Sequence, residues 1–217
     1  MLRLKDGFFA EAKGYILVGL LLGDGSLEFN GYRGTRLQIK QSAKKREYVE
    51  WLFDEFAEIV RTPPQERTDT KQWYFGTRYL AELTELRRIF YHNNRKVVPD
   101  IIIDLLVSPI SLAVWFMDDG ALDYRIKSHY SFSLSTDSFT VQEVTRLKDL
   151  LKFRFGITAS VQTPSSRGTR YPKIYIGKDG REQFLRLVRP YVLSCFFYKL
   201  PPFSQLDPSE TELLRAR

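Results

Sequence analysis

The chain has 217 residues, of which 43% are hydrophobic, with a formal net charge of +7 and a sequence pI of about 9.4. These values indicate a globular chain that can bury one large core or two small ones, and an excess of positive charge that suits a polyanion. The single cysteine, Cys195, excludes an intrachain disulfide, and with two histidines it provides too few ligands for an ordinary structural zinc site.

Apolar patterning predicts an alternation of helices and hairpins in the first part of the chain. In order, it gives a helix over 12–23, a hairpin over 27–41 turning at Asn30-Gly31, a helix over 45–60, two strands around 69–70 and a helix over 80–91. A loop over 93–99 and a short helix over 101–106 complete this part, which residues 1–11 precede as a polar lead.

The same order recurs in the second part of the chain. Pro109 opens a second apolar helix, and after it come a hairpin over 124–135, a helix over 141–155, strands over 158–162 and 173–176, a helix over 182–192, a loop over 198–201 and a polar tail from 207. Because corresponding features lie about 95 residues apart, the sequence predicts an internal duplication of an αββαββα unit.

Two short segments carry the strongest functional signal. Residues 17–25 read LVGLLLGDG and residues 112–120 read LAVWFMDDG, so each apolar run ends in an acid followed by glycine. Gly19 and Gly23 share one helix face, where a second helix can approach closely. If the two helices pack side by side, Asp24 and Asp119 arrive together at one end of the contact.

Other interpretations of these segments exist. A single apolar run of this length is usually a core helix, and a single Asp-Gly is most often a turn. Residues 117–119, Met-Asp-Asp, also suggest the acidic pair of a polymerase palm. That pair normally lies in a hairpin of β-formers, whereas these acids follow a helical run, and no Gly-rich phosphate loop is visible.

The two segments resemble the paired signature of the LAGLIDADG homing endonucleases, in the form that carries both copies in one polypeptide. The matching positions are Leu17, Gly19, Leu20, Asp24, Gly25, Leu112, Ala113, Asp119 and Gly120. Leu22 departs from the pattern where the family has its first acid, as do the bulky residues Trp115 and Phe116. Two copies with similar features downstream of each favour function over a core helix alone.

The resemblance implies an α+β fold with a half-domain over 1–108 and another over 109–217. Two antiparallel sheets form a DNA-binding saddle, and the motif helices pack at the interface. The implied activity is a double-strand break with short 3′ overhangs at a long, partly asymmetric site, promoting intron or intein mobility. The alternative is a non-catalytic nucleic-acid-binding protein of the same fold, such as an intron maturase or a transcription regulator.

Basic and polar residues concentrate in the predicted hairpins. No acid occurs over 29–46 or over 161–178, although both stretches are basic. A solvated sheet face would explain any one hairpin, but four hairpins depleted in acids favour a surface that binds double-stranded DNA. The candidate DNA-binding residues are Arg33, Arg36, Gln38, Lys40, Arg67, Lys71, Arg78, Arg125, Lys127, Arg167, Arg170 and Lys173.

The terminal acid of each motif is catalytic in the family that the chain resembles. We therefore expect Asp24 and Asp119 to share two or three divalent ions, with Mg²⁺ preferred because the ligands are oxygens. Backbone carbonyls of Gly23 and Asp118 are candidates to complete the metal shell.

Lysines and polar residues downstream of each motif complete the implied site. Lys96 and Lys199 resemble the basic residue that the family places near each scissile phosphate, although surface lysines beside loop prolines are an alternative. Gln41 falls where the family often has a water-orienting residue, and its counterpart is Asp137 in LSTDS. That difference predicts unequal cleavage of the two strands, although a strand-end polar residue need have no role.

The remaining expectations concern partners and location. Residues 1–13 are polar and mixed in charge, and no apolar run approaches the roughly 20 residues of a membrane span, so we expect neither a signal peptide nor membrane insertion. We expect a monomer without an obligate protein partner. Its expected location is intracellular, in a mitochondrion, a chloroplast or the cytoplasm of a microbe.

Overall fold

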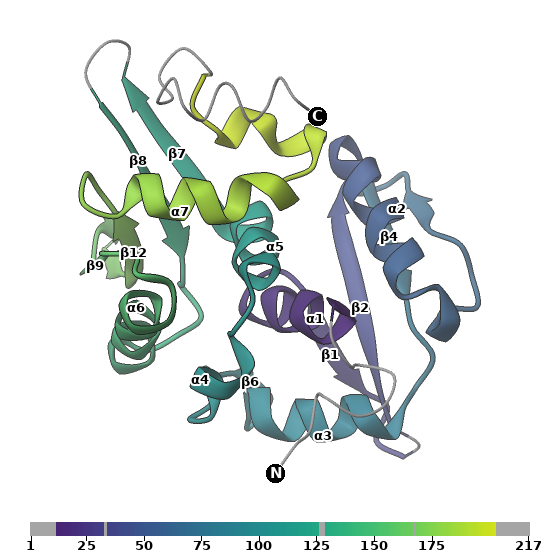
Figure 1. Cartoon of the computed structure of the whole chain (residues 1–217). Coiled ribbons are helices and arrows are strands. Elements are labelled where there is room, and N and C mark those ends of the chain that lie inside the picture. Colours follow the sequence, from purple (N-terminus) through teal and green to yellow (C-terminus); the bar gives the residue numbers. More distant parts are fainter. Residues whose placement is uncertain (1–11, 33, 126–128, 167, 203–217) are drawn as a thin grey trace.

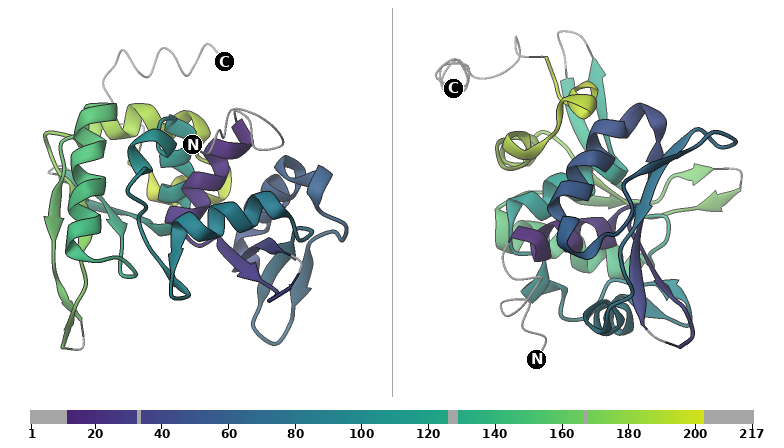
Figure 2. Two further views of the ribbon diagram at one scale, coloured as in Figure 1. Left: turned by 90° about the horizontal axis from the view of Figure 1, so that it is seen from below. Right: turned by 90° about the vertical axis from the view of Figure 1, so that its right-hand side faces the viewer.

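The computed structural model describes residues 12–32, 34–125, 129–166 and 168–202. The predicted polar lead over 1–11 and the tail from 207 lie outside these ranges. Within them, no helix combines the length and the apolar character needed to cross a bilayer. Two apolar helices occupy the centre of the molecule, and one four-stranded antiparallel sheet lies on either side of them (Figure 1; Figure 2, left).

The central helices are α1 (Ala12–Leu22) and α5 (Pro109–Asp119), which make an extensive contact with each other. Both are buried on nearly all sides, as their continuous apolar sequences predict. The contact is close at Gly19, where an added Cβ would lie 2.5 Å from the Ser111 carbonyl oxygen. Next to it, the Ser111 hydroxyl donates a hydrogen bond to the Tyr15 carbonyl at 2.7 Å.

The first sheet follows α1 directly and has the strand order β1-β2-β4-β3. Its strands are β1 (Ser26–Phe29), β2 (Thr35–Ser42), β3 (Gln65–Arg67) and β4 (Gln72–Gly76). The predicted turn at Asn30-Gly31 joins β1 to β2, with Gly31 at φ 79°. Helices α2 (Arg46–Glu55) and α3 (Ala81–Phe90) contact the sheet, and the burial along β2 alternates.

The second sheet follows α5 in the same way, with the order β7-β8-β12-β9. Its strands are β7 (Gly120–Arg125), β8 (His129–Ser135), β9 (Ser160–Gln162) and β12 (Lys173–Ile176). Helices α6 (Val141–Phe155) and α7 (Arg181–Val188) contact it, and β10 (Ser165–Ser166) pairs with β11 (Thr169–Arg170). The prediction of two antiparallel sheets with the motif helices packed between them is therefore confirmed.

Several predicted elements differ in detail from the structure. The start of the loop predicted over 93–99 belongs to a hairpin of β5 (Tyr91–His92) and β6 (Arg95–Lys96), whose strands are connected by two asparagines at positive φ. The helix over 45–60 is divided into η1 (Ala43–Lys45), α2 and η2 (Ala57–Ile59), and α4 is limited to Ile102–Leu105. The helix over 182–192 is α7 followed by η3 (Arg189–Tyr191). The first two residues of the loop over 198–201 belong to η4 (Ser194–Lys199).

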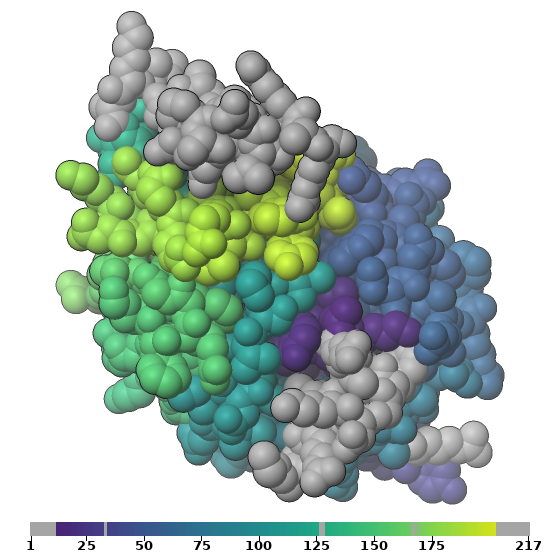
Figure 3. All heavy atoms as spheres, in the orientation of Figure 1, coloured from purple at the N-terminus to yellow at the C-terminus, as the bar shows by residue number. Residues whose placement is uncertain are grey.

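Two further contacts join the first part of the chain to the second. In the first, η4 packs on α2: the rings of Tyr48 and Phe196 lie 5.1 Å apart, and Glu47 accepts a hydrogen bond from the Ser194 hydroxyl at 2.7 Å. In Figure 3 the yellow atoms, which end the described part of the chain, lie against the blue atoms of the first part.

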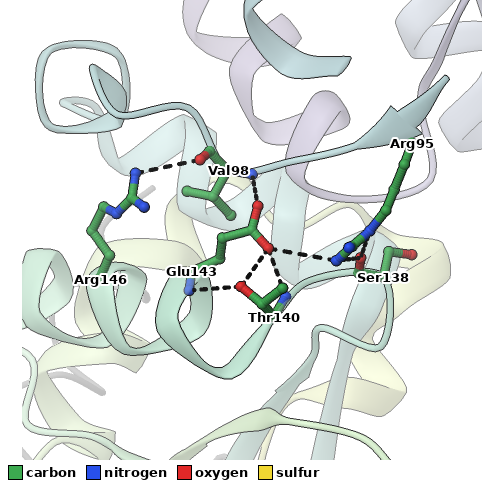
Figure 4. A network of polar contacts seen from close by, with 6 residues as sticks. All are labelled: Arg95, Val98, Ser138, Thr140, Glu143 and Arg146. Carbon is green, nitrogen blue, oxygen red and sulfur yellow. Dashed lines mark hydrogen bonds and ion pairs between the residues drawn. The ribbon is translucent and has the colours of Figure 1, made fainter. Parts of the chain in front are cut away.

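The second contact centres on Glu143, near the start of α6 (Figure 4). Its carboxylate accepts hydrogen bonds from the backbone N–H of Val98 at 3.0 Å and of Thr140 at 2.6 Å, and it lies 3.6 Å from the Arg95 guanidinium. Burial opposes ionisation of Glu143, but these hydrogen bonds lower its pKa overall. The segment between the two motif helices is thus tied to the second sheet's helix.

Candidate active site

The C-terminal ends of α1 and α5 meet, and both motif acids lie there. Asp24 is exposed and follows Gly23 directly after α1, whereas Asp118 and the half-buried Asp119 end α5. The Asp24 backbone N–H donates to Asp118 Oδ2 at 3.0 Å. The structure therefore brings together the ends of the two helices and the acids that they carry.

Burial and mutual repulsion change the acidity of these carboxyls. Burial, followed by the negative charge of Asp24, raises the pKa of Asp119 to about 7, although Lys96 and Lys199 oppose this rise. The same two causes raise the pKa of Asp118 well above its ordinary value. Carboxylates of like charge held this close have a high affinity for protons and, by the same electrostatics, for cations.

Gln41, at the end of β2, contacts both motif ends. Its Nε2 donates to Asp24 Oδ2 at 2.8 Å and to Asp118 Oδ1 at 3.1 Å, while its Oε1 accepts from Lys45 Nζ at 3.1 Å. Gln41 is only 6% exposed, because odd-numbered residues of β2 face inward. Sequence reasoning did not assign Lys45 to the site; its place four residues after Gln41, across the turn into α2, was the available signal.

The two predicted lysines bind the backbone at the helix ends. Lys96 Nζ donates to the carbonyl oxygens of Gly23 and Gly25, both at 2.7 Å. Lys199 Nζ donates to three carbonyls at the end of α5, including Met117 at 2.7 Å and Asp118 at 3.4 Å. A cation at these carbonyls complements the negative end of each helix dipole. The carbonyls predicted as metal ligands are therefore bonded to ammonium groups.

Lys96 and Lys199 were predicted to lie in loops, but the structure places both in regular elements. Lys96 lies on β6 and is half-buried, and Lys199 ends η4 and is 7% exposed. Burial lowers the pKa of Lys96, and burial together with the charge of Lys45 lowers that of Lys199 to about 8. Nearby acids, Asp119 among them, oppose both shifts.

The strand register corrects the predicted equivalence of Gln41 and Asp137. Ser26 pairs with Gln38 in the first sheet, and Ala121 pairs with Ser133 in the second. Each residue of the second pair lies 95 positions after the corresponding residue of the first pair. The residue 95 positions after Gln41 is Thr136, which is therefore its counterpart. Its buried hydroxyl donates to the Pro172 carbonyl at 2.6 Å. Asp137 follows it in an exposed turn, where its charge contributes to the raised pKa of Asp119.

The outer face of the first sheet gathers several of the predicted DNA-binding residues. Cross-strand pairing and alternation place Arg36, Gln38, Lys40 and Arg67 on the face opposite the core. Beside Asp24, this face forms a polar concavity. Its lining residues are Asp24, Ser26, Glu28, Gln38, Lys40, Gln41, Ser42 and Gln72. Gln72 was missed from the sequence, although it lies opposite Ser42 in β4.

Other predicted DNA-binding residues are less uniformly placed. Arg78 donates to the Glu58 carbonyl at 2.8 Å, and Arg36, on the outer face described above, forms an ion pair with Glu28 at 2.8 Å. Lys71 is exposed in the turn between β3 and β4. On the second sheet, Arg125 and Lys173 share the outer face, and Arg170 is exposed on β11; Arg33, Lys127 and Arg167 lie outside the described residues.

The donor set limits how a metal can bind here. Within the described ranges, no group of three or more histidines, cysteines, aspartates and glutamates is arranged as a metal site. Asp24 and Asp119 still fit a divalent cation, because each is an oxygen donor and a bound cation would relieve their repulsion. The protein thus offers two carboxylates, and further oxygen ligands must come from substrate or water.

Known proteins are similar to this chain in sequence. The model of the LAGLIDADG DNA endonuclease family matches residues 15–184, which include both motif helices and both sheets. Probable intron-encoded endonuclease 1 of Wickerhamomyces canadensis is 30% identical over 85% of this chain and 81% of its own length. Cytochrome b mRNA maturase bI2 of Debaryomyces hansenii is 29% identical over 85% of this chain and 72% of its own length.

A solved structure agrees with these sequence matches. The homing endonuclease I-WcaI, bound to its DNA recognition sequence, superposes with a TM-score of 0.75 at 28% identity, covering 87% of this chain and 85% of that chain. Its similarity extends over the fold that carries the paired acids. With its two motif helices, its two antiparallel sheets and a family match over most of its length, the chain belongs to the LAGLIDADG DNA endonuclease family.

Proposed function

We propose that the chain is a site-specific homing endonuclease that makes a divalent-metal-dependent double-strand break with short 3′ overhangs. One observation carries the proposal: the two motifs meet at their acidic ends, where the Asp24 backbone N–H donates to Asp118 Oδ2 at 3.0 Å, beside Asp119 at the end of α5. DNA has two strands, and one acid per strand is the matching arrangement. The proposal includes half-domains over 1–108 and 109–217, both motifs in one chain, and a monomer.

The proposed target is a long, partly asymmetric duplex site that promotes intron or intein mobility. Two sheets with different outer faces would contact the two sides of such a site. Arg36 and Lys40 suit guanine edges or phosphates, and Gln38 suits adenine. Most contacts would bind phosphates and fix the position of the protein rather than read sequence.

A divalent cation held by Asp24 and Asp119, with Mg²⁺ preferred, would neutralise phosphate charge and lower the pKa of an attacking water. Because ammonium groups already bond the carbonyls of Gly23 and Asp118, we assign the metal to the carboxylates and leave these carbonyls to the lysines. Lys96 and Lys199 would keep positive charge at the site, where negative charge grows on the phosphate.

Two substitutions test the proposal. Asp24→Asn and Asp119→Asn keep the size of the side chain but remove its charge, so they should abolish double-strand cutting while DNA binding persists. Asp149→Asn changes an exposed acid in α6 and serves as the matched control. Cleavage of a randomised DNA library would identify the target. If both variants cut that target at the wild-type rate, the assignment is wrong.

A second candidate function is assistance of intron RNA folding. It is favoured by the similarity to a protein named cytochrome b mRNA maturase bI2. Purified protein that promotes splicing of an intron RNA but fails to nick DNA with Mg²⁺ would support this alternative. Either function is consistent with the proposed location in an organelle or a microbial cytoplasm, which cell fractionation would test.

A further inference from the structure

Asp118 carries a side chain that the proposed chemistry does not use. It is 8% exposed, and its carboxylate points across the contact between the two motif helices rather than toward solvent. A Cβ built on Gly23 would lie 2.5 Å from Asp118 Oδ2 and 2.6 Å from its Cβ. The absent side chain of Gly23 therefore creates the space that the Asp118 carboxylate fills.

In that space, Asp118 helps to hold Asp24 at two points. Asp118 Oδ2 accepts the backbone N–H of Asp24 at 3.0 Å, which fixes the main chain where α1 ends. Asp118 Oδ1 accepts from Gln41 Nε2 at 3.1 Å, and the same nitrogen donates to Asp24 Oδ2 at 2.8 Å. The hydrogen bond from Lys45 to Gln41 Oε1 orients the amide, so its nitrogen faces the two acids.

The corresponding residues do not hold Asp119. The position equivalent to Asp118 in the first motif is Gly23, which has no side chain to offer. The counterpart of Gln41 is Thr136, whose hydroxyl donates to the Pro172 carbonyl at 2.6 Å. The counterpart of Lys45 is Thr140, which caps α6 by accepting the backbone N–H of Glu143. The two acids are therefore supported by different surroundings.

We infer that the Asp118 side chain, together with Gln41, is a positioning device through which the second motif orients the catalytic acid of the first. Asp118 touches neither substrate nor metal in this role; it acts through Asp24. This inference rests on the proposed nuclease function. It predicts that loss of Asp118 slows the strand served by Asp24 more than the other strand, because Asp119 does not depend on the contact.

The activity test measures the two strands separately on a target labelled at both 5′ ends. In Asp118→Ala, we expect one strand to be cut at least about tenfold more slowly than in wild type, with nicked DNA accumulating and binding retained. Asp118→Asn keeps one acceptor oxygen and should restore part of the rate. Thr136→Val removes a buried hydrogen bond at the counterpart of Gln41 and should leave the strand ratio unchanged.

A measurement without DNA or metal separates this inference from the proposed function. Hydrogen exchange of the Asp24 amide, followed in ¹⁵N spectra, should accelerate in Asp118→Ala and less so in Asp118→Asn. Gln41→Leu, which leaves Asp118 in place, tests the amide contact if the alanine variant does not fold. Equal slowing of both strands, or unchanged exchange at Asp24, would overturn the inference. If the wild-type chain cuts neither strand, the proposed nuclease function is refuted instead. Exchange of the Asp24 amide would then still test whether Asp118 holds Asp24.

Discussion

Replacement of Gly19 by alanine tests the close contact of the two central helices. In an unpacked helix, glycine to alanine stabilises by about 1 kcal/mol. Here the added Cβ would lie 2.5 Å from the Ser111 carbonyl oxygen and 2.7 Å from Val114 Cβ. Ordinary contacts between such atoms are about 3.5 Å or longer, so the helices must separate. Because overpacking of this kind costs about 1–3 kcal/mol or more, we expect Gly19→Ala to lower the unfolding free energy by about 1 kcal/mol net.

Urea unfolding of Gly19→Ala and Gly19→Ser would measure this effect, with serine more destabilising because it is larger. The pair Asp149→Gly and Asp149→Ala, at an exposed position in the middle of α6, gives the intrinsic glycine-to-alanine difference in this protein. Separation of the helices should also move Asp24 away from Asp119 and lower the pKa of Asp119. A Gly19→Ala protein that is more stable than wild type would refute the packing argument.

Three further predictions concern pH, the joint between the two parts, and salt. In the proposed site, Asp119 must be ionised to hold a cation, and its pKa is about 7. Cleavage at limiting Mg²⁺ should therefore rise as pH increases from about 6 to about 8, and the midpoint of this rise should be lower at higher Mg²⁺; a flat profile would contradict the proposal. Without metal, the folded chain holds the Asp119 proton more tightly than the unfolded chain does. The resulting contribution to stability is complete below pH 3.8 and is lost as pH rises through about 7. Glu143→Ala leaves the Val98 N–H without its acceptor and removes the capping box with Thr140. It should therefore lower the free energy of urea unfolding by about 2–3 kcal/mol. Glu143→Gln should lower it less, and equal losses of unfolding free energy in the two variants would argue against the network. The Kd for duplex DNA should rise at least about tenfold between roughly 50 and 200 mM salt, and a Kd that ignores salt would exclude phosphate contacts as its main source.

Local signals in the sequence predicted much of the fold. The helix predicted over 141–155 has these bounds in the structure, because Thr140 and Glu143 form a capping box at its start and Gly156 ends it at φ 69°. Asn30-Gly31 likewise marked the first hairpin. In both cases the determining interactions lie within a few residues of each other along the chain, which is the range that pattern reasoning covers.

The details of the site depend on contacts that are distant in sequence. For Asp118 the sequence predicted only a backbone carbonyl that could bind metal, whereas the use of its side chain depends on Gly23, 95 residues away. The choice of Asp137 instead of Thr136 was a shift of one residue, and just after β8 this shift exchanges a buried position for an exposed one. The helix-end bonds of Lys199 depend on where η4 packs, and no local pattern encodes that position.

The fit of the Asp118 carboxylate against Gly23 has a consequence for recombination between relatives. Two copies of the first motif would leave a hole where that carboxylate lies, and two copies of the second would force two buried acids into one space. Each motif helix is therefore matched to its own partner. Chimaeras that exchange one part of this chain with a relative should assemble only when the incoming helix supplies the complementary small or acidic residue at that position.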